Sequence, residues 1–128
     1  MPGQIRLTAI YYSGIVILSY SDKGITNYRY ANVTFEISTA YHSTPSSEEL
    51  KRIAEQDPSN TKVLNIDGVW VVLIEKAHWG WPELEELYGP VPFAYFWLNS
   101  HYYMVSVKPP ITSDQLVCII RSMKLLTS

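Results

Sequence analysis

The sequence has little charge, a single cysteine and no long hydrophobic run. Asp, Glu, Lys and Arg make up 17% of its 128 residues, whereas hydrophobic residues reach 47% and aromatic residues 13%. This composition excludes intrinsic disorder, which requires few aromatic residues and many charges. Ten Lys and Arg against twelve Asp and Glu give a net charge of −2. We therefore expect no nucleic-acid partner, because the chain lacks the broad basic surface that such binding uses.

The one cysteine, Cys118, cannot form an internal disulfide, and it excludes a cysteine-ligated zinc module. The longest apolar runs, such as Val69–Ile74, are far shorter than the ~20 residues needed to span a bilayer. The N-terminus also lacks a signal-peptide pattern. We expect a soluble chain that contacts a membrane only through an anchor absent from this chain. The length predicts one domain, residues 1–128.

Common catalytic motifs are missing as well. The sequence contains no GxGxxG, GxxxxGK[ST] or GxSxG pattern. Cys118 lies between apolar residues, and we expect it to pack as a small buried hydrophobe. His42, His78 and His101 lack the spacing of known zinc motifs and are expected to be separate surface or packing residues. The sequence therefore predicts no catalytic residue, no metal site and no cofactor.

The sequence does contain repeated strand and turn patterns. Ser13-Gly14 separates two β-rich runs and predicts a hairpin. Asp67-Gly68 between two apolar runs predicts a type I′ hairpin, and a third hairpin is expected around Asn99-Ser100. Because Val69–Ile74 is apolar on both faces, this strand should lie inside the sheet. The expected strands are 5–12, 15–20, 33–38, 63–66, 69–74, 93–98 and 101–107.

Two segments carry helix signals. Ser46 and Glu49 have capping-box spacing, and Pro58 marks the end of that helix. Thr112 and Gln115 begin a second helix, which runs to residue 123. Residues 77–92 between them are interpreted as one long irregular insertion. Within it, Glu83, Glu85 and Glu86 are expected to form the solvated face of one helical turn between Leu84 and Leu87. The fold class is therefore α+β, with a mainly antiparallel sheet of six or seven strands packed against two helices.

The order of elements over residues 63–123 also carries a family resemblance. It depends on Asp67-Gly68, the strand with Trp97, Tyr102-Tyr103 and the helix 112–123, together with the N-terminal segment AIYYSGIVILSYSDKG. These features resemble the C-terminal domain of unknown function of extracytoplasmic regulators and lipoprotein-sorting (LolA/RseB-like) proteins of bacteria and archaea. The resemblance implies a curved half-barrel with helices on its concave side, located outside the cytoplasm or in the cell envelope.

Five aromatic residues are candidates for binding. Trp79 and Trp81 flank a glycine, where they can anchor a partner or fold back over the core. Tyr95, Trp97 and Tyr103 lie on the two strands of the last hairpin. They can line a groove for an apolar ligand or fill the space beneath the C-terminal helix.

The leading functional hypothesis is a non-catalytic, extracytoplasmic binding or interaction domain, monomeric or weakly dimeric, that recognises a protein, a lipid or an envelope component. One alternative is an enzyme or enzyme subunit with a site in the insertion 77–92, where His78 would work with Glu75 or Glu83. Another is a structural or viral protein that assembles by pairing of edge strands. A cytoplasmic location stays open as an alternative.

Overall fold

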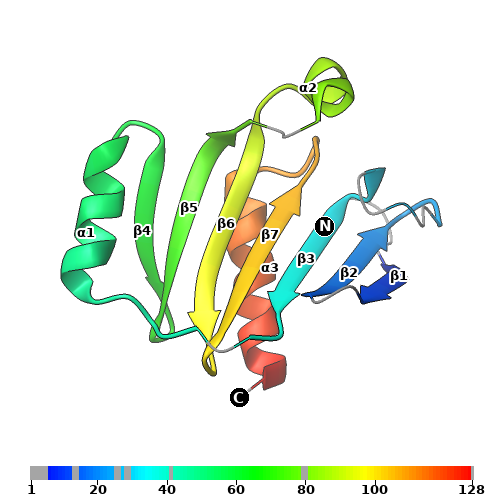
Figure 1. Ribbon diagram of the computed structural model, residues 1–128. Coiled ribbons are helices and arrows are strands. Elements are labelled where there is room, and N and C mark those ends of the chain that lie inside the picture. Colours follow the sequence, from blue (N-terminus) through cyan, green and yellow to red (C-terminus); the bar gives the residue numbers. More distant parts are fainter. Residues whose placement is uncertain are drawn as a thin grey trace.

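The computed structural model describes residues 6–12, 15–24, 27, 30–40, 42–78 and 81–127, with side chains up to residue 122. In these ranges the chain forms a seven-stranded sheet and three helices (Figure 1). The strands are β1 (Arg6–Tyr12), β2 (Ile15–Ser21), β3 (Val33–Ser38), β4 (Thr61–Ile66), β5 (Val69–Ala77), β6 (Val91–Leu98) and β7 (His101–Val107). The helices are α1 (Ser47–Gln56), α2 (Pro82–Tyr88) and α3 (Ser113–Thr127).

The sheet is open and curved, and each pair of neighbouring strands is antiparallel. The strand order is β1-β2-β3-β7-β6-β5-β4, so that β7 lies between the two halves of the sheet. The predicted α+β class with a mainly antiparallel sheet is confirmed. The strands of all three predicted hairpins pair, and the turn residues Ser13-Gly14 of the first lie outside the described residues. Asp67 and Gly68 have φ angles of 51° and 91°, and Asn99 and Ser100 have 52° and 65°, as type I′ turns require.

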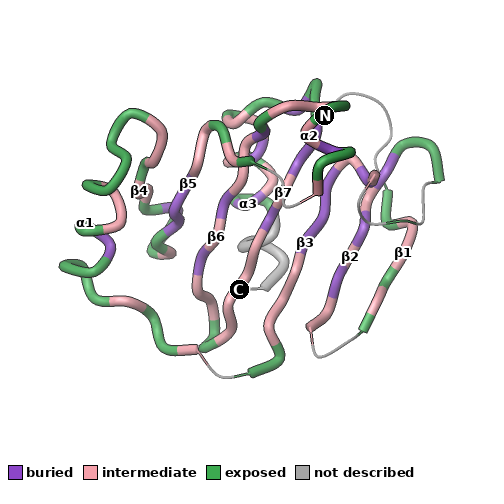
Figure 2. Tube along the Cα trace, turned by 45° about the horizontal axis from the view of Figure 1, so that its top comes forward, coloured by how far each residue is buried: buried purple, intermediate pink, exposed green. Residues whose placement is uncertain are grey.

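Helix α3 covers one face of the sheet and closes the main core (Figure 1). Its predicted capping box is present, because the Gln115 amide donates to Thr112 Oγ1 at 3.3 Å and the Thr112 amide donates to Gln115 Oε1 at 2.9 Å. Ile111 and Leu116 on either side of this cap are both buried. Figure 2 shows that buried positions are concentrated along the inner strands. The core cluster is Val33, Phe35, Ile66, Val71, Leu73, Ala94, Phe96, Val105, Val107, Ile111, Leu116 and Ile120.

Helix α1 packs at the β4 edge on the opposite face. The predicted capping box forms at Ser46, whose Oγ accepts from the Glu49 amide at 3.2 Å. Leu50 is buried, and it borders a small hollow with Val63 and Trp70. These two strand residues alternate with the core positions beneath α3, so they point away from it. The helices are therefore divided between the two faces, whereas the resemblance implied the concave side for both.

The segment 77–92 is more regular than the sequence predicted. Strand β5 continues to Ala77, and α2 then begins with Pro82 at its first position and ends before Gly89 at a φ of 66°. The interpretation as one long irregular insertion was therefore wrong. Within α2, Leu84 is buried and Leu87 is 64% exposed. A two-turn helix presents only one of these leucines to the protein interior.

Cys118 also differs from the expectation, because it is a free, exposed thiol. Leu116 and Ile120 on the same helix are buried, and a residue two positions from each points away from their stripe. The neighbouring apolar residues suggested burial, but the helical period places Cys118 in solvent.

No helix in the described part of the chain combines the length and hydropathy needed to cross a bilayer.

Candidate functional site

The sheet face opposite α3 carries a continuous set of aromatic side chains. Phe93, Tyr95 and Trp97 alternate along β6, and Tyr102 on β7 pairs with Trp97 in the strand register. Their ring centroids lie 6.1 Å (Phe93 to Tyr95), 5.6 Å (Tyr95 to Trp97), 5.8 Å (Tyr95 to Tyr102) and 5.4 Å (Trp97 to Tyr102) apart. All four residues are partly exposed. We call these four residues the aromatic row.

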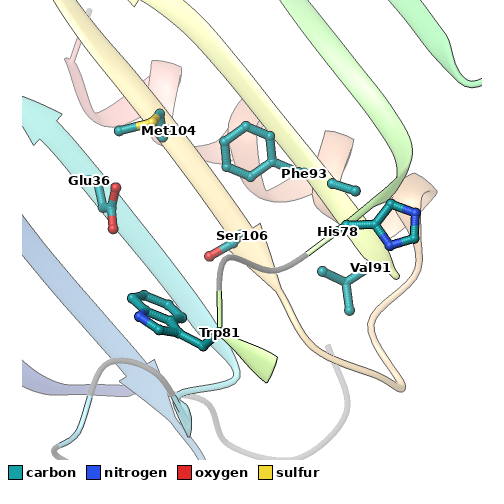
Figure 3. A pocket seen from close by; sticks show the side chains of 8 residues that line it. Glu36, His78, Trp81, Val91, Phe93, Met104 and Ser106 are labelled. Carbon is teal, nitrogen blue, oxygen red and sulfur yellow. The ribbon is translucent and has the colours of Figure 1, made fainter. Parts of the chain in front are cut away.

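A pocket of about 180 Å³ lies at the Phe93 end of the aromatic row. It forms where β3, β6 and β7 meet the segment that joins β5 to α2. Figure 3 shows the Glu36 carboxylate and the Trp81 indole toward the β3 side, with Phe93, Val91 and His78 toward the other side. The lining residues are Glu36, Ala77, His78, Trp81, Val91, Phe93, Met104 and Ser106.

An irregularity in β5 helps to build this pocket. The β5–β6 register shifts between Ile74 and Ala77, where Ile74 pairs with Phe93 and Ala77 pairs with Val91. A β-bulge of this kind places Ala77 on the same face as Ile74, which regular alternation does not allow. The chain then continues through His78 at the pocket rim. Trp81, at the N-cap of α2, forms one wall of the pocket.

The pocket and the row are weakly solvated. Burial raises the pKa of the Glu36 carboxyl, and in the part of the chain that the structure describes this carboxylate makes no hydrogen bond or ion pair. Burial also raises the pKa of Tyr95. The pKa of Tyr102 rises to about 12, first through burial and then through the charges of Tyr95 and Glu36. The phenols are therefore neutral, and Glu36 is the acidic group of an otherwise largely apolar surface.

His78 does not pair with either of the glutamates considered in the enzyme hypothesis. Its Nδ1 lies 2.9 Å from Oε1 of Glu85, and its side chain is 77% exposed. Glu75 instead accepts from Lys62 Nζ at 3.0 Å and from Ser113, and these hydrogen bonds lower its pKa. The histidine and its carboxylate partner thus lie at the solvent-exposed rim of the pocket.

The other two histidines meet at the end of β3. His42 Nε2 lies 3.0 Å from Ser38 Oγ, and His101 Nδ1 lies 3.0 Å from the Ser38 carbonyl oxygen. The β6–β7 turn and the segment after β3 thus bring both imidazoles to one serine, where they act as packing residues. Among the described residues, no three His, Cys, Asp or Glu side chains gather in a way that could hold a metal ion.

The predicted binding residues fall on different surfaces. Tyr95 and Trp97 belong to the aromatic row, and Trp81 lines the pocket. Tyr103 lies on the α3 face, where its ring stacks on Phe96 at 5.0 Å and packs against the core. Trp79 lies outside the described residues.

Sequence reasoning missed Glu36 and Tyr102. A two-residue turn at Asn99-Ser100 aligns Trp97 with Tyr102, so the hairpin register alone places Tyr102 in the row. Glu36 had no comparable local signal. It reaches the site through the pairing of β3 with β7, where it lies opposite Met104.

The chain matches no known family model, no curated protein and no solved structure. The resemblance to lipoprotein-sorting proteins therefore stays a prediction.

Proposed function

We propose that this chain is a non-catalytic binding domain whose ligand surface is the aromatic row with its adjoining pocket. The observation that carries the proposal is the row itself, four touching and partly exposed rings on a sheet face that α3 leaves open. Aromatic side chains supply large contact areas at low entropic cost, and they are enriched where proteins bind their partners. A protein segment, a lipid or an envelope component fits this surface.

We also propose an extracytoplasmic or cell-envelope setting. It is supported by the small share of charged residues, 17%, and by the ten tyrosines in the chain. Neutral hydroxyl groups thus provide much of the polarity that charges supply in an average soluble domain.

The aromatic row can be tested with amide-resolved NMR titrations. The probes are phosphatidylethanolamine–phosphatidylglycerol vesicles, peptidoglycan fragments and capped apolar peptides, added separately. We expect at least one probe to shift the resonances of Tyr95, Trp97 and Tyr102. Replacing Trp97 with alanine should weaken that binding about fivefold or more, because truncating a buried interface aromatic typically costs at least ~1 kcal/mol.

Tyr12→Ala is the matched control, since Tyr12 is an aromatic residue, 74% exposed, on the edge strand β1, which three strands separate from β6. It should leave the affinity unchanged. Shifts confined to the α3 face, or no shift with any of the three probes, would contradict the proposal.

Assembly through strand β1 is a second candidate function. β1 is an edge strand, and it exposes Leu7, Ile10 and Tyr12 on one face. An unprotected edge with apolar side chains can pair with another copy of the chain. We expect the mass measured by sedimentation velocity to rise with concentration, and Ile10→Lys to abolish that rise. A constant monomer mass up to millimolar concentration would eliminate this candidate.

A further inference from the structure

We propose that the pocket at Glu36 binds an organic ammonium group. This inference rests on the proposed function and names the class of ligand: an amine or quaternary ammonium that places its cationic end in the pocket and its apolar remainder along the aromatic row. The shared chemistry covers a free organic amine and the lysine side chain of a peptide.

Glu36 is the acidic side chain that faces the pocket. Its carboxylate lines the pocket, is desolvated by its surroundings, and has no hydrogen-bonding or ionic partner within the described residues. A desolvated carboxylate without a partner is costly. A cation that enters the pocket would supply the missing countercharge.

The walls of the pocket are mainly aromatic and apolar. Trp81, Phe93 and Met104 surround the space next to the carboxylate (Figure 3). The faces of Trp and Phe attract cations, and the attraction strengthens when the site is desolvated. Calcium and magnesium prefer six or more oxygen ligands, whereas among the described residues the side-chain oxygens that line this pocket belong to Glu36 and Ser106. These walls therefore suit a cation that carries its own carbon substituents.

The pocket also has the size and the electrostatic surroundings that suit a small organic cation. A volume of about 180 Å³ is slightly larger than the ~150 Å³ apolar cavity that accommodates benzene, so a trimethylammonium group or the end of a lysine side chain fits. Helix α2 at the rim carries Glu83, Glu85 and Glu86 and contains no basic residue. Its negative charge favours the approach of a cation.

The experiment compares choline with its neutral carbon isostere, in which a tert-butyl group replaces the trimethylammonium. Binding is followed by the amide resonances of Glu36, Phe93 and Ser106. We expect choline to shift these resonances and to bind about tenfold tighter than the neutral isostere. Glu36→Gln, which preserves the shape of the side chain, should remove that preference. Glu86→Gln makes the same charge change on the exposed surface of α2 and should retain it.

A second pair of variants tests the pocket wall. Trp81→Leu should weaken choline binding about fivefold or more, whereas Trp70→Leu should have no effect. To distinguish the two sources of ligand, a capped pentapeptide with a central lysine is titrated beside its alanine analogue. Tighter binding of the lysine peptide than of choline assigns the pocket to a peptide partner, and the reverse assigns it to a free amine.

Equal binding of choline and the neutral isostere would overturn the ammonium proposal and leave the aromatic row as a binding surface. The same conclusion follows if Glu36→Gln retains the preference for the cation. If neither compound shifts the pocket resonances while the vesicles, peptidoglycan fragments or peptides still shift the row, the pocket inference fails alone. Failure of all these probes removes the proposed function with it.

Discussion

Replacing Leu84 with alanine is expected to lower the free energy of unfolding by about 3 kcal/mol, because truncating a fully buried leucine removes its transfer energy and leaves a cavity. Leu84 is 0% exposed and is the buried residue of α2. Chemical denaturation at neutral pH measures the loss. The matched control is Leu87→Ala in the same helix, 64% exposed, which should change the stability by no more than about 0.5 kcal/mol.

The same substitution should also affect the pocket. Trp81 is the N-cap residue of α2, and the Trp81 carbonyl accepts from the amides of Leu84 and Glu85 at 3.1 and 3.2 Å. Because Leu84 anchors this helix, its removal is expected to displace Trp81 from the pocket wall. This displacement should be seen as broadening of the NMR resonances of the pocket residues in the folded Leu84→Ala variant. If Leu84→Ala is as stable as Leu87→Ala, then α2 is not anchored by Leu84 and the pocket does not depend on it.

The stability of the protein is expected to rise by about 2 kcal/mol between pH 7 and pH 10 through Lys108 alone. This residue is 3% exposed. Its Nζ donates to the Ala31 carbonyl at 2.7 Å and lies 5.9 Å from the centroid of the Tyr88 ring. Burial lowers the pKa of Lys108 from 10.5 to about 8.

The sign follows from proton binding. Between pH 8 and pH 10.5 the unfolded chain holds a proton on Lys108 that the folded chain has lost, so stability increases with pH in this window. Below pH 8 both states are protonated, and the folded state bears the full cost of the buried charge.

Urea denaturation of the protein and of Lys108→Met at each pH unit from 7 to 10 isolates this contribution. Other titrating groups, including Tyr102 with its pKa of about 12, are present in both proteins and cancel in the difference. The free energy of unfolding of the protein minus that of Lys108→Met should increase with pH. Lys51 is an exposed lysine on α1, and the free energy of unfolding of the protein minus that of Lys51→Met should not change with pH. A flat difference for Lys108→Met would mean that the ammonium is hydrated in the folded state.

Local signals predicted the elements of the fold well. The Asp67-Gly68 turn and the two capping boxes each act over a few residues, and each is confirmed. The strand predicted at residues 33–38 also forms, but Thr34 on its polar side is buried, so burial does not alternate along it. Only one turn of helix α2 was predicted, because its N-cap is Trp81, which makes no side-chain cap, and because the helix has only two turns. Its exposed Leu87 further obscured the amphipathic pattern.

The site was harder to predict than the fold, because it depends on register between distant strands. The sequence predicted the alternation of Tyr95 and Trp97 on β6, and both lie in the row. Tyr102 and Tyr103 lie on opposite faces of the sheet. Because α3 covers the face that carries Tyr103, Tyr103 packs against the core and Tyr102 belongs to the uncovered aromatic row. The β5 bulge and the β3–β7 pairing bring His78 and Glu36 to one pocket. Neither feature can be predicted from a short stretch of sequence.

The position of β7 between β3 and β6 has a consequence for biosynthesis. β3 pairs with β2 and with β7, and β7 is the last of the described strands to be synthesised. Until β7 has been synthesised, one edge of β3 stays unpaired. Pairing β3 with β7 closes a long loop, which is a slow step in folding. Glu36 then meets Met104 and Ser106 only after β7 has emerged from the ribosome. A nascent or prematurely terminated chain therefore contains the aromatic side chains of β6 without the pocket beside them.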